Sequence, residues 1–586
     1  MPQDYTLRDY NKEPRLKPRQ ATSQAALLES QGISRWIRGP TMPYGFTPRP
    51  SRQAPKQPGA ANRIPLEIAS HISSYLDVKD LGRAAMAWRP VAQATNASPE
   101  FIKLECGKYS LLVNDSLRWP PDTTRMVRDR MEQYNFAWST LLYSGSQDIS
   151  IPGTTQDTPW AGSNDWKSGH TFMGESNGYM YNVATMGPPG AQMQARVCVY
   201  QLPSLRTGET DLRRTEFNVV LRSHFVKAVT VDPVGQVVAI LEFNNNAHDQ
   251  SPGAFLHVYN LNGRHMRSVQ ITTFLKPAAE VAHMELNGEM VCIVTHYPSY
   301  RSLIGTASDV FMQNWVGQTR FAAPQRCHGT DDATYCTGFQ FITEDLWIAT
   351  EKGKTDWEDG IPTHFIRVGH VRRQLQTVVK LRDTLGKGYT PNNVSLIRNA
   401  SHYSPVSGMF YANPASRLFG IKYEYRNLKL QDHDTGNVTA NCCLFGRATI
   451  EMWLGIGAPP GPSDSLHWLH MPIVNNNDAS HQRSDPTNCQ GIYLIGRRLF
   501  WAAIWPQGWS FHLIDYNPGA GKIISSTEPI RGNSGHWCSA TTLFGNDPYA
   551  VSISTTIRLS DLLRVVPTED GILLKQQHGI YKMLMM

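Results

Sequence analysis

The chain has 586 residues, 41% of them hydrophobic and 18% charged, so it can bury large cores, and its length alone predicts several domains. We find no apolar run of about 18 residues that could span a bilayer, and the polar start at residues 1–4 is not typical of a secretory signal. The nine cysteines are odd in number and scattered, which indicates reduced thiols and a cytoplasmic and/or nuclear location.

The excess of positive charge lies at the N-terminal end. Residues 1–63 hold eleven Lys and Arg against four Asp and Glu, whereas the remaining residues hold 45 of each. This segment is rich in Pro, Gln and Arg, so we predict a disordered basic leader over residues 1–61. It is either a nuclear-import signal, densest at residues 15–19, or a solvated tail. The balanced charge elsewhere argues against a nucleic-acid-binding core.

Short helical patterns follow over residues 62–105. Pro65 can occupy the first turn of a helix, where its missing N–H costs nothing. Apolar side chains then recur on one face of this helix, at Ile68, Ala69, Ile72 and Leu76. A second helical stretch can be capped by Asp77 or Asp80, and Pro90 is expected to kink or shorten the third. These helices are too small to bury their own apolar faces.

The order of these residues resembles the F-box. The matching segments are Ile64-Pro65-Leu66-Glu67-Ile68, Ile72, Tyr75-Leu76-Asp77, Asp80-Leu81 and Ser98-Pro99-Glu100-Phe101. Trp88 and Val91 depart from the family pattern. The resemblance implies a three-helix module that binds the Skp adaptor of cullin-RING ubiquitin ligases, and through it a cullin. The residues that it implies for adaptor contact are Ile64, Pro65, Leu66, Ile68, Ile72, Leu76 and Leu81. The other interpretation is an ordinary helical hairpin packed on the main domain.

A linker with a connecting helix is predicted over residues 106–164. Asp122 can cap this helix, and apolar residues recur along it at steps of four, three and four, namely Val127, Met131, Tyr134 and Trp138. The helix would either join two modules rigidly or lie on the surface of the large domain.

From about residue 165 to residue 586 the pattern changes to short β-runs broken by turn residues. The clearest unit, residues 226–272, contains four runs and an Asn262-Gly263 pair typical of hairpins. Its second run, residues 237–241, is apolar throughout and is expected to be buried on both faces. Similar groups cover residues 281–315, 336–371, 409–423 and 492–516. Repeated groups of three or four short strands are typical of β-propeller blades.

The predicted fold is therefore an α+β multidomain chain. A small three-helix module at residues 62–105 precedes a mainly β domain at residues 165–586, expected to be a β-propeller of six to eight blades. No repeated Trp-Asp or kelch signature is present, and a pair of two-sheet sandwiches is the rival architecture.

No motif in the sequence predicts an active site. Residues 519–522 resemble a phosphate loop but lack its first Gly and its Ser or Thr, and no Cys or His spacing completes a tetrahedral metal set. No catalytic residue, metal or cofactor is predicted, and the chain is not expected to be an enzyme. The adjacent Cys442 and Cys443 are expected on a strand, with one thiol on each face.

The F-box resemblance implies a substrate-recognition subunit of an SCF-type ubiquitin ligase, which binds the Skp adaptor through its helices and a client protein through its β domain. The candidate client-binding residues are Trp505, Trp509, His536 and Trp537. Neither nucleic acid nor a membrane is expected as a partner. Two alternatives remain. One is a β-propeller hydrolase or carbohydrate-binding protein with an incidental helical segment. The other is an F-box scaffold that acts outside ubiquitination.

Overall fold

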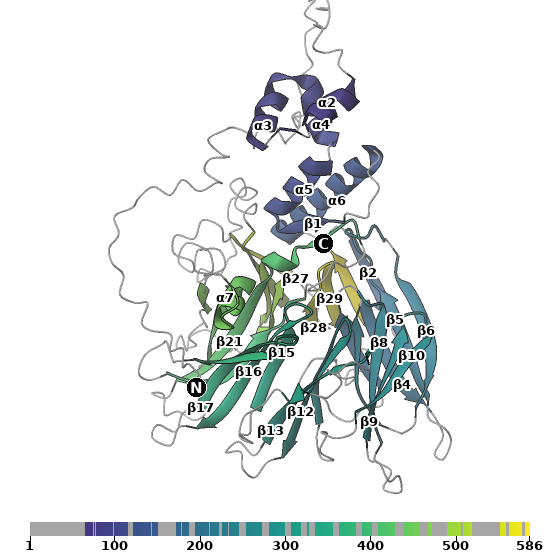
Figure 1. Ribbon diagram of the computed structural model, residues 1–586, viewed down its shortest axis with the longest axis vertical. Helices are drawn as coiled ribbons and strands as arrows, with labels where there is room; N and C mark the ends of the chain where they lie inside the picture. The colour runs from purple at the N-terminus through teal and green to yellow at the C-terminus, as the bar shows by residue number, and fades with distance from the viewer. Residues whose placement is uncertain are drawn as a thin grey trace, which may run out of the picture.

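The computed structural model describes residues 65–114, 121–150, 171–517 and 551–586, with gaps between neighbouring elements. The predicted leader, residues 1–61, lies outside the described residues. Figure 1 shows the helices of residues 66–140 gathered at one end of the molecule and the sheets fanned out beyond them.

The N-terminal described part is helical. Its helices are α2 (Leu66–Ser73), α3 (Val78–Ala87), α4 (Arg89–Ala97) and α5 (Pro99–Lys108). Helix α4 contacts both α2 and α3, so these three helices form one small unit. We expected Pro90 to kink or shorten a helix, and the structure shows instead that it lies at the start of one. The chain ends α3 at Ala87 and begins α4 at Arg89, so Pro90 lies in a first turn, where the missing N–H is tolerated.

The predicted connecting helix is α6 (Pro121–Thr140). Because α6 begins at Pro121, Asp122 lies within its first turn instead of capping it. The four apolar residues of the predicted stripe are buried: Val127, Met131, Tyr134 and Trp138. Helix α6 also contacts α5. It therefore belongs to the core of the large domain and at the same time supports the smaller helices.

The described residues of the remaining chain form seven four-stranded antiparallel sheets, which we number as blades in chain order. Blade one holds β3 (Thr171–Ser176), β4 (Tyr179–Met186), β5 (Gln194–Gln201) and β6 (Arg213–Val220). Blade two holds β7 (Phe225–Asp232), β8 (Val237–Asn244), β9 (Gly253–Asn260) and β10 (His265–Ile271). Blade three holds β11 (Glu280–Asn287), β12 (Met290–Pro298), β13 (Thr306–Asn314) and β14 (Gln325–Arg326).

The later blades follow the same order. Blade four holds β15 (Tyr335–Phe341), β16 (Leu346–Thr355), β17 (Pro362–His370) and β18 (Leu375–Leu381). Blade five holds β19 (Tyr389–Ile397), β21 (Leu418–Asn427), β22 (Val438–Gly446) and β23 (His467–Met471), with a short helix α7 (Arg447–Trp453) after β22. Blade six holds β24 (Cys489–Ile495), β25 (Arg498–Trp505), β26 (Gly508–Asp515) and β27 (Val551–Ile557).

The sheets are arranged as a ring. The first strand of each blade contacts the first strand of the next, from β3 through β7, β11, β15 and β19 to β24, and β24 contacts the seventh blade. This arrangement is that of a β-propeller, and seven blades lie within the predicted six to eight. The four strands predicted over residues 226–272 are β7 to β10, and residues 237–241 are fully buried as expected.

The seventh blade joins the two ends of the propeller sequence. It holds β28 (Leu562–Pro567), β29 (Gly571–Gln576) and β30 (Ile580–Met585), and its outermost strand is β2 (Gly145–Ser150), which pairs with β30. The predicted propeller boundary at residue 165 was therefore wrong. Strand β2 was missed because Ile149 is its only large apolar side chain, so it has no β-type alternation.

One predicted strand pair was also wrong. Residues 410–412, which we grouped with the strand at 418–423, form β20 (Phe410–Ala412). This strand pairs with β1 (Leu111–Val113) in a separate two-stranded sheet. The first strand of blade five is instead β19, so the segment with β20 and the 3-10 turn at residues 414–416 is an insertion between β19 and β21.

The two ends of the ring differ. At one end the first strand of each blade turns into the second, and neighbouring turns are joined by hydrogen bonds. The Asp232 carboxylate accepts from Gly288 N at 3.1 Å, and Asn287 Nδ2 donates to the carbonyl of Thr343 at 2.7 Å. Helix α6 packs at this end, which we call the α6 end. The connections between second and third strands lie at the opposite end.

Candidate functional site

Helix α2 and the turn after it leave three apolar side chains in contact with solvent. Ile68 and Ile72, four positions apart on one face of α2, are 52% and 38% exposed, and Tyr75, in the turn after Ser73, is 76% exposed. We call these three residues the α2 stripe. Among the α2 side chains that the structure describes, Ala69 and Ser73 are buried, and α2 contacts α4. Ile68 and Ile72 are therefore not buried within the helical unit.

The other adaptor-contact residues are placed as follows. Pro65 is exposed at the start of α2, and Leu76 is half-buried. Leu66 and Leu81 lie in α2 and α3, but their side chains are outside the described set, and Ile64 is outside it altogether. The expectation that Ala69 shares a face with Ile68 and Ile72 was wrong.

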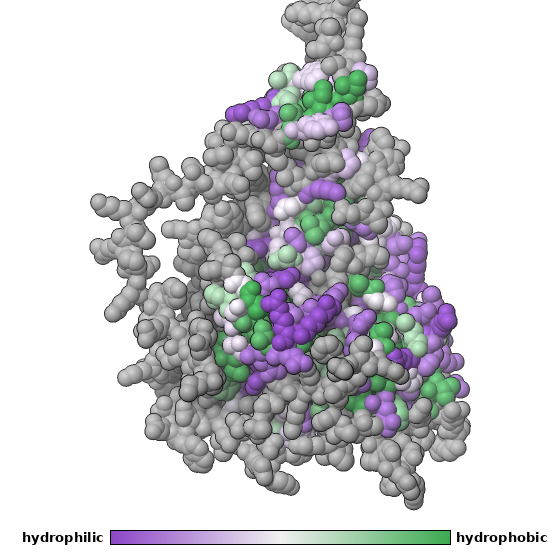
Figure 2. Space-filling model, viewed as in Figure 1, coloured by the Kyte–Doolittle hydropathy of each residue, from purple (hydrophilic) through white to green (hydrophobic). Residues whose placement is uncertain are grey.

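One exposed apolar residue of the helical unit was missed by sequence reasoning. Met86, on α3, is 42% exposed, and it lies beside the small residues Ala84 and Ala85 that were expected to form the apolar face of this helix. Figure 2 shows green, apolar side chains at the surface of the helical part at the top of the view. The unit therefore presents apolar surface from more than one of its helices.

An ion pair attaches α5 to α6. Arg128 of α6 places both Nε and Nη2 at 3.2 Å from Glu105 Oε2 of α5, and both side chains are largely buried. Beside this pair, the Cys106 Sγ lies 3.1 Å from the Met131 Sδ. Burial, with the nearby Glu105 charge, raises the pKa of Cys106 to about 12. The thiol is therefore protonated at neutral pH and serves packing rather than chemistry.

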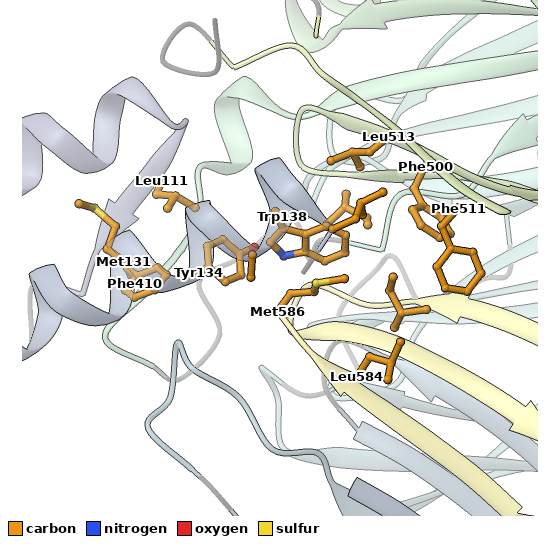
Figure 3. Packing of buried hydrophobic residues seen from close by; sticks show 14 of the residues in the cluster. Leu111, Met131, Tyr134, Trp138, Phe410, Phe500, Phe511, Leu513, Leu584 and Met586 are labelled. Carbon is orange, nitrogen blue, oxygen red and sulfur yellow. The ribbon is translucent and has the colours of Figure 1, made fainter. Parts of the chain in front are cut away.

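A buried arginine fixes α6 to blade six. Arg498 Nε lies 3.0 Å from Asp515 Oδ2, and its Nη2 donates to Asn135 Oδ1 of α6 at 3.2 Å. The same guanidinium lies 5.5 Å from the ring centre of Tyr134 and 5.9 Å from that of Trp138. Figure 3 shows Tyr134 and Trp138 reaching from α6 toward the side chains of the blades.

A second buried arginine joins α6, blade one and blade seven. Arg206 follows β5 and makes two hydrogen bonds to Asp570, from Nε at 2.7 Å and from Nη2 at 2.8 Å. Its Nη1 lies 3.0 Å from Glu569 Oε2. Burial alone would lower the pKa of Arg206. The negative charges of Asp570 and Glu569 outweigh this effect and raise the pKa above its ordinary value, so the guanidinium stays charged. Tyr134 donates to the carbonyl of Glu569, which brings α6 into the same cluster.

The candidate client-binding residues do not gather at one described surface. Trp505 ends β25 and Trp509 lies in β26, both at the opposite end of the ring, where Trp505 pairs with Gly508. Their side chains are outside the described set. His536 and Trp537 lie outside the described residues, in a connection whose flanking positions, Asp515 and Val551, pair with each other at the α6 end.

The described residues contain no group of three or more His, Cys, Asp and Glu side chains that could hold a metal ion. Among the described helices, none is long and apolar enough to cross a membrane. Cys442 and Cys443 lie on β22 as predicted, and each thiol packs in a different hydrophobic cluster. Burial raises the pKa of Cys443 above its ordinary range, as expected for a structural thiol.

No family model and no curated protein matches the chain. Its fold is similar to the β-propeller domain of the Trilobed protease from Pyrococcus furiosus, at a TM-score of 0.30 and 7% identity over 59% of this chain and 83% of that one. It is also similar to the WD40 domain of SCAP from fission yeast, at a TM-score of 0.32 and 8% identity over 75% of this chain and 98% of that one. The tricorn protease is similar at a TM-score of 0.34 and 10% identity over 71% of this chain. The match spans only 34% of the tricorn protease chain. The seven sheets themselves define the architecture.

Proposed function

We propose that the chain is the substrate-recognition subunit of an SCF-type ubiquitin ligase. In this proposal the α2–α4 unit binds a Skp adaptor and the seven-bladed ring binds a client protein. The observation that carries it is the α2 stripe. Ile68 and Ile72 are exposed on one face of α2 and Tyr75 is exposed in the turn that follows, which is the apolar surface that a helix-binding partner would cover.

The attachment of α6 to the ring supports the same function. A receptor in such a ligase does no chemistry and acts by holding a client lysine near a charged ubiquitin carrier. That role requires a constant distance between adaptor and client. Helix α6 is bound to the buried Arg498 by Asn135 and to the Glu569 carbonyl of the Arg206 cluster by Tyr134, and the Glu105 to Arg128 pair continues the support to α5.

The client surface is proposed at the opposite end of the ring. The α6 end is occupied by α6 and by the β1–β20 sheet, whereas Trp505 and Trp509 belong to a hairpin at the other end. Tryptophan is enriched among residues that dominate protein interfaces. The adaptor and the client would then lie at opposite ends of the receptor.

The test is reconstitution of the full chain with a Skp adaptor and a cullin. A receptor is expected to form a stable complex with both. A complex that contains the adaptor but excludes the cullin would favour the scaffold alternative. Recovery of the chain without the adaptor would contradict the proposed function and favour a propeller hydrolase or a carbohydrate-binding protein.

A further inference from the structure

Blade two carries a further polar cluster, far from α2 in the sequence and not used by the proposed function. Ser268 Oγ, on β10, lies 2.8 Å from His257 Nδ1 of β9. The other ring nitrogen of His257 lies 3.5 Å from Glu242 Oε2 of β8. On its other side, Ser268 Oγ lies 2.9 Å from His265 Nε2. We call these four residues the blade-two cluster.

The cluster runs from a buried acid to an exposed hydroxyl. Glu242 and His257 are buried, whereas Ser268 and His265 are exposed on the outermost strand. Residues on the same face of the blade, among them Ile240 and Tyr259, pack in one hydrophobic cluster with side chains of blade one. The buried half of the blade-two cluster is therefore shielded from water, and its hydroxyl is open to a ligand.

The order of the groups determines the proton positions. His257 Nε2 makes no hydrogen bond among the described residues, and the Glu242 carboxylate at 3.5 Å acts on it by charge alone, which favours the tautomer that carries its proton on Nε2. The lone pair of Nδ1 then faces Ser268 Oγ, so the serine hydroxyl donates to His257. This is the relationship between nucleophile, base and orienting acid that activates serine in acyl transfer, with the two ring nitrogens exchanged relative to the usual order.

We propose that Ser268 is an activated nucleophile for acyl transfer from small, unhindered esters, with His257 as general base and Glu242 orienting it. Ser268 Oγ forms a bond to the ester carbonyl carbon while its proton moves to His257 Nδ1. The bond from that carbon to the alcohol oxygen breaks, and the leaving alcohol takes the proton from His257. Water then cleaves the acyl-serine with the same base, releasing the acid. His265 holds Oγ from the solvent side.

The experiment is labelling of the full chain with a fluorophosphonate, read by intact mass and peptide mapping. One label per chain at Ser268 is expected, and Ser268→Ala should abolish it. His257→Gln should slow labelling by about a hundredfold or more, the usual size of general-base catalysis. Ser146→Ala is the matched control, because Ser146 is an exposed serine on the outermost strand of blade seven. It should leave labelling unchanged.

A second measurement does not depend on the folding of variants. The labelling rate of the unaltered chain should not rise in proportion to hydroxide concentration, because a general base and not hydroxide takes the serine proton. Absence of a label at Ser268, labelling that His257→Gln leaves unchanged in a folded variant, or a rate that keeps rising with hydroxide would each overturn the proposal. None of these outcomes depends on adaptor binding.

Discussion

The hydroxyl of Tyr134 donates a buried hydrogen bond of 3.0 Å to the main-chain carbonyl of Glu569. Tyr134 lies in the middle of α6, and Glu569 lies in the turn between β28 and β29 of the closing blade. The carboxylate of Glu569 accepts from Ala412 N at 3.2 Å and pairs with Arg206 of blade one. Tyr134 is therefore bound to a residue, Glu569, that itself joins the closing blade to Ala412 and Arg206, and we expect α6 to unfold together with the propeller.

Replacing Trp138 tests this expectation. Trp138 is fully buried between α6 and the blades, so Trp138→Ala should lower the free energy of unfolding by about 3–5 kcal/mol. Phe136→Ala is the matched control on the same helix. Phe136 is 53% exposed, and its removal should change stability by less than about 0.5 kcal/mol. Urea unfolding measures the loss of unfolding free energy in each variant. Equal losses in the two variants would show that Trp138 does not anchor α6 in the core.

The Arg206 cluster should be essential for closure of the ring. Arg206→Met leaves the buried carboxylates of Asp570 and Glu569 without their cation, which should cost about 3–5 kcal/mol of unfolding free energy. Arg213→Met removes an exposed arginine whose Nη2 lies 2.6 Å from Glu209, and should cost less than about 1 kcal/mol. Similar losses in the two variants, measured by chemical denaturation, would contradict a closing role for Arg206.

His296 should make stability depend on pH. Burial lowers the pKa of His296 below its ordinary value of 6.5, only partly offset by its hydrogen bond to the carbonyl of Cys336. The unfolded chain therefore takes up the proton first, and the His296 contribution to stability is lost as pH falls below about 6.5. When the pH is lowered from about 8 to about 5, the free energy of unfolding of His296→Gln should fall by less than that of the unaltered chain. Parallel pH profiles of unfolding free energy would contradict this assignment.

Much of the ring could be predicted from the sequence because its strands are strongly patterned. Residues 237–241 are apolar throughout, and Asn262-Gly263 forms the expected turn, with a positive φ of 82° at Gly263. The periodicity of Val127, Met131, Tyr134 and Trp138 correctly predicted α6. These signals are local, so each was visible in a short window of sequence.

What depends on distant partners could not be predicted. Strand β2 has little apolar pattern of its own and is defined by pairing with β30, more than 400 positions away. Strand β20 looks like a blade strand and pairs instead with β1. On α2, apolar periodicity alone could not show that Ala69 is buried while Ile68 and Ile72 are exposed, because that choice is made by contact with α4. The blade-two cluster forms across three strands and has no linear motif.

The most direct test of the proposed function is a binding titration of the full chain with a purified Skp adaptor. One adaptor per chain is expected, and Ile72→Asp should weaken binding by about a hundredfold or more because it places a charge in an apolar interface. Leu375→Asp is the matched control on β18, since Leu375 is 39% exposed and Ile72 is 38% exposed. It should bind as the unaltered chain does. Equal affinities of the two variants, or no binding by the unaltered chain, would contradict the account.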